Sequence, residues 1–180
     1  LVVATPTAVP PPATVKGPAG TVISATSDMA EMGLDPSLDN SSNVKTFFDE
    51  IHLYGIMQGP DGELIGGAAS KWEVAPDQLS WIYTVREGVS FHNGDPLTPE
   101  DMAWSWNRSI CPGPPTDGSC KAENSTSAVQ GPATESIIAE GNTVIVRTHE
   151  PEPLMPLWWP SYEGGQAGTV QSKAEFDRTG

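Results

Sequence analysis

The alternation of apolar and polar positions is clearest in the middle of the chain, where it predicts strands joined by tight turns. Residues 72–74 predict a short strand, and residues 79–86 predict a longer one because they are rich in aromatic and β-branched side chains. Pro76 and Asp77 favour a turn between them, since proline presets φ and aspartate bonds to its own backbone. Residues 89–91 predict a third strand, so the three strands are expected to form a small antiparallel meander.

A helix start follows the predicted meander. Thr98 is a suitable N-cap residue, and Pro99 fits the first helical position. Glu100 and Asp101 place negative charge beside the exposed amides of the first turn. Thr98 and Asp101 together make a variant of the capping box in which Asp replaces the usual Glu or Gln. The pattern predicts a helix that continues to residue 108.

Four further segments have a readable pattern. Residues 20–26 predict a first strand. Residues 41–53 predict a helix, because their apolar positions recur at spacings of three and four, and that apolar face is expected in the core. Residues 54–65 and residues 136–148 each predict a hairpin, since turn residues separate two apolar runs.

Composition limits the class of protein. The chain has 180 residues, which is enough for one domain with its own core, and its 18 glycines and 18 prolines predict many loops and turns. The formal charge of −14 argues against a nucleic-acid ligand and against an anionic membrane surface. No apolar run reaches the roughly 18 residues that a spanning helix needs.

No catalytic pattern stands out in the sequence. His52, His92 and His149 lie in a predicted helix, a turn and a strand end, where surface or turn roles are expected for each. The carboxylates are scattered, and no nucleophile motif or phosphate-binding loop is present. The sequence therefore predicts a protein that is not an enzyme and that has neither a cofactor nor a metal site.

Residues 72–101 contain the pattern W-E-V-x-x-D-x-L-x-W-x-Y-x-V-R-E-G-V-x-F-H-N-G-x-P-L-T-x-E-D. This pattern resembles the family 5 extracellular solute-binding proteins, the oligopeptide, dipeptide and nickel receptors of ABC importers. Upstream, the Leu-Asp-Pro triplet at residues 34–36 resembles the family's L-D-P. The resemblance covers roughly residues 20–160 and is expected to fade beyond Gly164.

The resemblance implies an α+β fold of the type II periplasmic-binding-protein kind. The expected structure is a partial lobe with antiparallel and mixed strands, hairpins and few helices. Residues 1–19 are expected to be a Pro/Thr-rich linker or tether, and residues 20–180 the N-terminal portion of the solute-binding domain. Because family members are much longer, the second lobe is expected to be absent, and a lone partial lobe cannot close on a ligand.

The implied function is extracytoplasmic binding of a small solute for uptake by an ABC transporter. A peptide is the expected solute and an oligosaccharide the alternative, with an ABC permease as the partner of the full-length receptor. A lipid anchor upstream of Leu1 is expected from the family, and a chain that starts at Leu1 rather than Met suggests a processed or trimmed product. The alternative function is a truncated structural or adhesive domain, tethered at the surface, without transport activity.

The resemblance also implies two groups of ligand-contacting residues. One group precedes Asp35 in the loop where the family's contact segment falls, although an ordinary solvated loop fits the same residues. The other group lies near the return of the chain to the ligand cleft, where aromatic rings can stack on a sugar or a peptide side chain. The six residues are Ala30, Glu31, Met32, Trp158, Trp159 and Tyr162.

Cys111 and Cys120 are the two cysteines of the chain, and eight residues separate them. They form either a disulfide that closes a Pro/Gly/Ser/Thr loop or two free surface thiols. The resemblance to an exported family favours the disulfide, which contributes roughly 2–3 kcal/mol on the loop-entropy model. Two thiols without a nearby histidine pair supply too few ligands for zinc.

Overall fold

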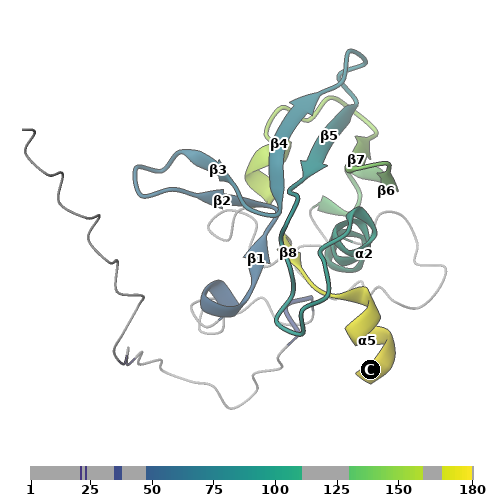
Figure 1. The fold of residues 1–180 in the computed structure, drawn as a ribbon. Coiled ribbons are helices and arrows are strands. Elements are labelled where there is room, and N and C mark those ends of the chain that lie inside the picture. The colour runs from purple at the N-terminus through teal and green to yellow at the C-terminus, as the bar shows by residue number, and fades with distance from the viewer. Residues whose placement is uncertain are drawn as a thin grey trace, which may run out of the picture.

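Four antiparallel strands form the main sheet of the protein, seen in a computed structural model that describes residues 21, 23, 35–37, 48–110, 130–159 and 168–179 (Figure 1). The spatial order is β4-β5-β7-β6. β5 lies inside the sheet, with Tyr83 opposite Trp72 on one side and opposite Val144 on the other. The strands are β4 (Ala69–Val74), β5 (Ser80–Val85), β6 (Thr134–Glu140) and β7 (Thr143–Thr148). The predicted hairpin at residues 136–148 is confirmed by β6 and β7.

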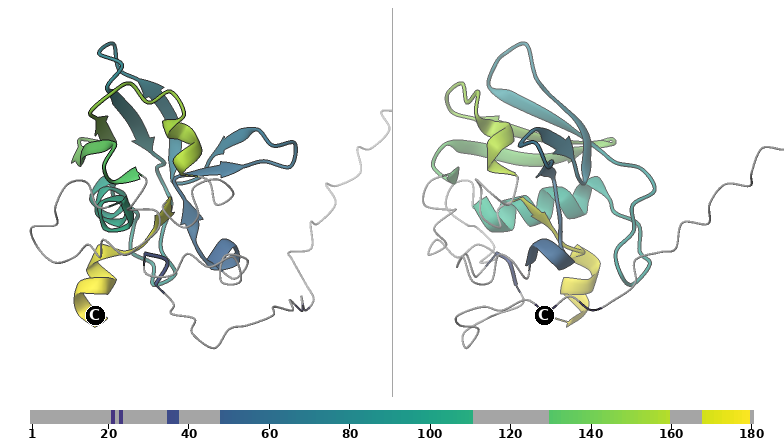
Figure 2. Two further views of the ribbon diagram at one scale, coloured as in Figure 1. Left: turned by 180° about the vertical axis from the view of Figure 1, so that it is seen from behind. Right: turned by 90° about the vertical axis from the view of Figure 1, so that its left-hand side faces the viewer.

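Helix α2 (Pro99–Ile110) packs across one side of this sheet (Figure 2). Its apolar side chains Met102, Trp106 and Ile110 are fully buried in the core. Burial of one large apolar side chain contributes about 1.5–3 kcal/mol, so this face of the helix supplies much of its stability. The helix starts where the sequence predicts and runs two residues further than predicted.

The predicted capping box at the start of α2 is confirmed. The Asp101 carboxylate accepts hydrogen bonds from the Thr98 backbone N–H at 3.0 Å and from the Thr98 hydroxyl at 2.7 Å. In return the Asp101 backbone N–H donates to the Thr98 hydroxyl oxygen at 3.2 Å. The side chain of Asp is therefore long enough to close the box in place of Glu or Gln.

Three aromatic rings form the centre of the core. Trp106 of α2 stacks on Trp159, with ring centroids 3.8 Å apart and ring planes 7° apart. Tyr83 of β5 meets both indoles edge-on, at centroid distances of 5.1 Å and 5.7 Å. The Trp159 indole N–H donates to the Tyr83 hydroxyl at 2.6 Å, which pairs two polar atoms that would otherwise be buried without a partner.

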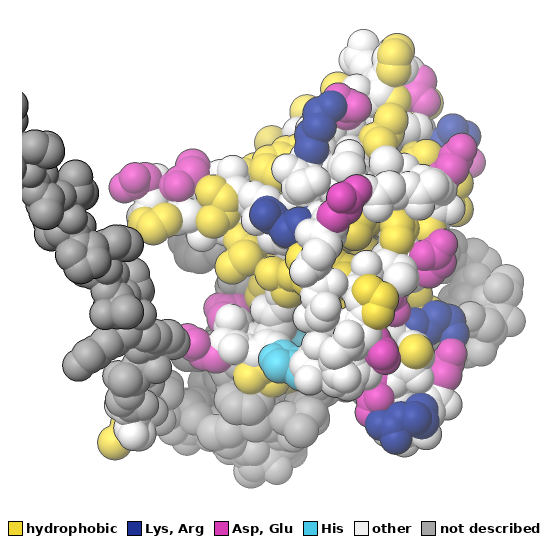
Figure 3. All heavy atoms as spheres, in the orientation of Figure 1, with side chains coloured by type: hydrophobic (Ala, Val, Ile, Leu, Met, Phe, Trp, Pro, Cys, Tyr) yellow, Lys and Arg dark blue, Asp and Glu magenta, His cyan; other side chains and the backbone are white. Residues whose placement is uncertain are grey.

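Smaller elements complete the fold on either side of the main sheet. The hairpin of β2 (Ile56–Gln58) and β3 (Leu64–Gly66) confirms the predicted hairpin at residues 54–65. It projects from the body with acidic side chains at its end (Figure 3). The short 3-10 helix η1 (Met155–Trp158) follows β7 along the chain.

A second small sheet joins distant parts of the chain. β1 (Leu53–Tyr54) follows a helical turn at residues 48–51 and pairs with β8 (Thr169–Val170). β8 leads directly into helix α5 (Lys173–Thr179), beside the C-terminal end of the chain (Figure 1).

The predicted meander is wrong in its third strand. Residues 89–91 form no strand; Ser90 makes an isolated bridge with Pro96, and the loop closes on itself. The place beside β5 is taken by β7, whose six residues offer a longer apolar partner. Sequence proximity favours the meander, but a longer strand from further along the chain buries more apolar surface.

Two predicted elements fall partly outside the described residues. Of residues 20–26, Thr21 and Ile23 are described; neither lies in a strand, and Ile23 is 90% exposed, so the strand predicted there is wrong at both positions. Of residues 41–53, the described end contains the helical turn, and Phe48 is fully buried as expected. Residues 41–47 lie outside the described residues, and the helical turn ends at residue 51, two residues earlier than predicted, because Leu53 pairs in β1.

Candidate functional site

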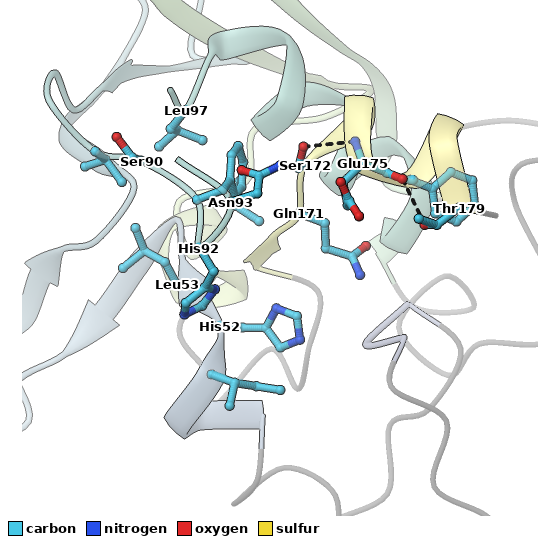
Figure 4. A pocket seen from close by; sticks show the side chains of 15 residues that line it. His52, Leu53, Ser90, His92, Asn93, Leu97, Gln171, Ser172, Glu175 and Thr179 are labelled. Carbon is cyan, nitrogen blue, oxygen red and sulfur yellow. Dashed lines mark hydrogen bonds between the residues drawn. The ribbon is translucent and has the colours of Figure 1, made fainter. Parts of the chain in front are cut away.

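A cavity of about 510 Å³ opens where four segments of the described chain meet (Figure 4). These segments are the residues around His52, the loop at residues 89–97, the end of β8 and one side of α5. The volume lies within the roughly 300–1,000 Å³ of small-molecule sites. Most of the wall is apolar, with side chains such as Leu53, Phe91 and Val170.

The loop at residues 89–97 forms one wall, and its shape follows from local bonding. The Leu97 backbone N–H donates to the Val89 carbonyl oxygen at 3.0 Å and closes the base of the loop. Gly94 sits near the tip at φ +92°, a conformation that residues with a side chain rarely adopt. The Asn-Gly pair in the sequence therefore fixes the curvature of this wall.

Two imidazoles lie near one another at one side of the cavity, on the end of the first helical turn and on the loop (Figure 4). Burial lowers the pKa of His52; the nearby carboxylate of Asp35 opposes this shift, and His92 adds to it. The His52 ring meets Phe48 edge-on at 5.3 Å, and its buried Nε2 has no hydrogen-bond partner within the described structure. The lowered pKa favours the neutral imidazole form of His52.

Helix α2 holds the opposite wall of the cavity through a row of polar side chains. The Asp101 carboxylate accepts a hydrogen bond from the Lys173 backbone N–H at 2.9 Å. One turn later, the Ser105 hydroxyl accepts one from the Gln171 backbone N–H at 2.9 Å. These bonds attach β8 and α5 to the helix, so the cavity wall is fixed to the core.

Residues 35–37 reach the same region from the N-terminal side. Asp35 pairs with Arg108, the next polar residue along the row on α2, and Arg108 also donates to the Gln171 side chain at 3.3 Å. Burial raises the pKa of Asp35. The hydrogen bonds from Arg108 and from the Ser37 N–H, together with the charge of Arg108, lower this pKa by more than burial raises it. The pKa of Asp35 therefore lies below its usual range.

The structure describes two of the six predicted contact residues, Trp158 and Trp159. Trp158 is half-buried, and Trp159 is fully buried between Trp106 and Tyr83, so its ring has no exposed face in this conformation. Neither Trp158 nor Trp159 lines the cavity. The other predicted contacts and both cysteines lie outside the described residues: Ala30, Glu31, Met32, Tyr162, Cys111 and Cys120.

Two searches of the described residues bear on other kinds of site. Within them, no group of three or more His, Cys, Asp or Glu side chains is arranged to hold a metal ion. No helix among the same residues is both long enough and apolar enough to cross a membrane.

Comparison with known proteins decides the family. The family model for bacterial extracellular solute-binding proteins, family 5 (middle), matches residues 63–176, which is more than half of the chain. The chain belongs to the family 5 bacterial extracellular solute-binding proteins. The match extends to residue 176, so the expectation that the resemblance fades beyond Gly164 is wrong.

Curated family 5 relatives match over short stretches. The periplasmic oligopeptide-binding protein OppA of Haemophilus influenzae is 38% identical over 52 residues, which are 29% of this chain and 10% of OppA. The periplasmic murein peptide-binding protein MppA of Escherichia coli is 26% identical over 105 residues, 53% of this chain and 19% of MppA. The chain thus spans between 10% and 19% of the length of these two relatives.

Solved structures of the same kind confirm the type II fold. The H. influenzae OppA complex with the peptide RPPGFSPFR superposes with a TM-score of 0.66 at 18% identity, over 81% of this chain and 29% of OppA. MoaA of A. tumefaciens R10, in complex with mannopinic acid, gives a TM-score of 0.67 at 19% identity, over 83% and 29%. At 18–19% identity, such structural similarity shows the fold alone. This fold agrees with the predicted α+β partial lobe.

Sequence reasoning missed the residues that build the cavity of this family 5 chain. Gln171 lies between β8 and α5, and Phe176 lies in the short helix α5, where the sequence has no readable period. A signal did exist in α2, where Asp101, Ser105 and Arg108 recur at spacings of four and three and therefore share one face of the predicted helix. A polar stripe of this kind, beside the apolar stripe, marks a second packing surface.

Proposed function

We propose that the chain is the N-terminal part of an extracytoplasmic receptor that binds a small solute for uptake by an ABC importer. The observation that carries this proposal is the family 5 match over residues 63–176. The names of the relatives OppA and MppA favour a peptide over an oligosaccharide as the solute. The permease would be the partner of the complete receptor, and the chain would have no catalytic role.

The proposed solute surface combines the cavity with the two contact groups expected from the family. The mostly apolar wall of the cavity suits an apolar side chain of the solute. Ala30, Glu31 and Met32 would pair with polar groups of the solute. Trp158 and Tyr162 would stack on the solute. Trp159 would support Trp158 from the core, since their ring centroids are 6.5 Å apart. The proposed contacts are therefore Ala30, Glu31, Met32, Trp158 and Tyr162.

We also propose that Cys111 and Cys120 form a disulfide. Intact mass of the protein, alkylated before and after reduction, tests this pairing. An oxidised pair takes up no alkylating reagent until it is reduced, whereas two free thiols are labelled at once.

The test of the proposed function uses the complete natural protein that contains these 180 residues. Isothermal titration with a mixture of short peptides, followed by single sequences, should give saturable binding. Glu31→Gln should weaken it, since a charge-assisted bond to the solute is lost. Glu87→Gln, an exposed substitution outside the proposed surface, is the matched control and should leave the affinity unchanged.

A folded protein that binds no peptide would contradict the peptide proposal. Saturable binding of an oligosaccharide by the same protein would then move the proposal to that solute. Absence of binding to both classes, together with adhesion of the protein to a surface, would favour the structural or adhesive alternative.

A further inference from the structure

We propose that the cavity binds an apolar group that carries a carboxylate, with the carboxylate at the imidazoles of His52 and His92, so that binding takes up a proton. The bound molecule should then be held more tightly as the pH falls. This assignment rests on the proposed function, because the cavity is part of the proposed solute surface. It adds the chemical class of the group that enters the cavity.

The cavity offers a large apolar space with two imidazoles at one side (Figure 4). Its volume of about 510 Å³ is enough for a small molecule, and Leu53, Phe91 and Val170 belong to its apolar wall. Charge interactions are stronger beside such a wall than in water, because the local dielectric constant is lower. A ligand that fits both parts has an apolar body and one polar end at the imidazoles.

His52 has hydrogen-bonding capacity that the described structure does not use. Its Nε2 atom is buried and has no hydrogen-bond partner among the described residues. A buried polar atom without a partner is destabilising, and such atoms are therefore uncommon in folded proteins. The His52 ring lines the cavity and meets the Phe48 ring edge-on at 5.3 Å. A ligand in the cavity that bonds to this imidazole would remove the unfavourable term.

The other polar groups of the wall favour an anionic ligand over a cationic one. Glu175 is the one acidic side chain among the described residues that line the cavity, and both of its oxygens accept hydrogen bonds from Arg178. The Asn93 side chain is bonded to Asp95, through Nδ2 as donor and Oδ1 as acceptor. An imidazole can gain a positive charge near neutral pH, so a carboxylate is the group that the two histidines can pair with.

The charges around His52 act in opposite directions. Burial lowers the pKa of His52 most, the charge of Asp35 raises it, and His92 lowers it. Glu50 is exposed on the helical turn, and the other acidic side chains on the surrounding elements have partners of their own. The pairs are Asp35 with Arg108, Asp49 with Tyr54, Asp95 with Asn93, Glu175 with Arg178, and Asp177 with Lys173.

Binding and protonation are coupled in such a site. A carboxylate beside an imidazole raises the pKa of the imidazole, so the complex holds more protons than the free protein. Affinity therefore rises as the pH falls through the pKa of the complex, and it levels off below the pKa of the free protein. Asp35 stays ionised over this range, because its pKa lies below its usual value. Since one proton changes Kd at most tenfold per pH unit, we expect a Kd roughly five- to tenfold lower at pH 5.5 than at pH 7.5.

The test is isothermal titration of the complete natural protein at pH 5.5 and pH 7.5. Two buffers with different heats of ionisation give the number of protons taken up. The probe for a free acid is N-acetylleucine, and the probe for a peptide end is the tripeptide Ala-Ala-Leu. The C-terminal amide of each probe removes the carboxylate, so it should bind weakly and equally at the two pH values.

Three histidine variants locate the proton. His52→Gln keeps a hydrogen-bonding side chain that does not titrate, so it should abolish most of the pH dependence. His92→Gln changes an exposed ring on the loop and should reduce the pH dependence in the same direction. The matched control is His149→Gln, because His149 is also exposed but does not line the cavity. This control should keep both the Kd and the proton uptake of wild type.

The outcomes separate this assignment from the proposed function. Peptides that bind equally as acid and amide, at both pH values, overturn the carboxylate assignment and leave the proposed function standing. Proton-linked binding of N-acetylleucine without binding of any peptide supports the assignment for a free acid and contradicts the peptide proposal. If neither acid binds at pH 5.5, the assignment is wrong, whatever the wider peptide mixture shows. If His52→Gln does not fold, unchanged proton uptake in His92→Gln overturns the assignment.

Discussion

The hydrogen bond between Trp159 and Tyr83 gives the most direct test of the aromatic core. Replacing Trp159 by Phe keeps a ring against Trp106 but removes the indole N–H that donates to the Tyr83 hydroxyl at 2.6 Å. The lost bond and the unpaired buried hydroxyl cost about 1–3 kcal/mol together. The smaller ring adds about 1 kcal/mol for the space it leaves. We expect the free energy of unfolding to fall by roughly 2–4 kcal/mol.

A double-mutant cycle isolates the hydrogen bond from the packing. Tyr83→Phe alone leaves the Trp159 N–H buried without its acceptor, so it should also destabilise the protein, by about 1–2 kcal/mol. With both substitutions present, no polar atom of the pair remains. The double variant should therefore lose about 1–2 kcal/mol less than the sum of the two single effects.

Urea unfolding followed by circular dichroism measures all four proteins of this cycle. Additive single effects, within about 0.5 kcal/mol, would refute the claim that the pair is coupled. The same variants bear on the site. Because Trp159 is fully buried and Phe keeps a ring beside Trp158, Trp159→Phe should change the Kd for the solute by less than about twofold wherever the protein is folded. A large change in Kd would show that Trp159 acts on the solute site, directly or through Trp158.

Three further predictions concern the cap, a close approach and acid. Thr98→Ala should cost about 1 kcal/mol in urea unfolding, because the capping box of α2 is lost. Gly168→Ala should destabilise more strongly, since an added Cβ would lie 1.8 Å from the Trp159 carbonyl oxygen. Arg108 lowers the pKa of Asp35, so the stability this carboxylate gives is present above the unfolded pKa of about 3.9 and lost as pH falls through the lower folded pKa. Urea unfolding at pH 5 and pH 2 should show that loss, and Asp35→Asn should remove it.

The local pattern predicted the elements that are held by neighbours in sequence. The capping box needs two residues three apart, and the two confirmed hairpins need a turn between adjacent runs. Such signals are complete within a few residues, so sequence reasoning can find them. The meander failed because pairing is a competition: residues 89–91 are adjacent to β5, but β7 forms the longer ladder from further along the chain.

The candidate site was harder to predict because its parts come from distant segments. Arg108 donates hydrogen bonds to Asp35 and to Gln171, and more than sixty residues of sequence separate the partners of each bond. The residues around His52, the loop at residues 89–97 and residues 170–179 each supply part of the cavity, and they lie far apart in the sequence. Trp159 was predicted as a ligand contact but is buried in the core. The sequence alone does not distinguish an aromatic residue at a cleft from one in the core, because its spatial neighbours come from distant segments.

Helix α2 explains how one short motif in the sequence serves both the core and the site. Its apolar residues, such as Trp106, fill the space beneath the sheet, and its polar residues hold β8, α5 and the segment around Asp35. Charged and hydroxyl side chains are acceptable in a buried face only because each finds a partner there. The polar face of α2 is therefore stable in the folded protein only when β8, α5 and the segment around Asp35 supply its hydrogen-bond partners. The twelve-residue helix α2 thereby joins the main sheet to the candidate solute surface.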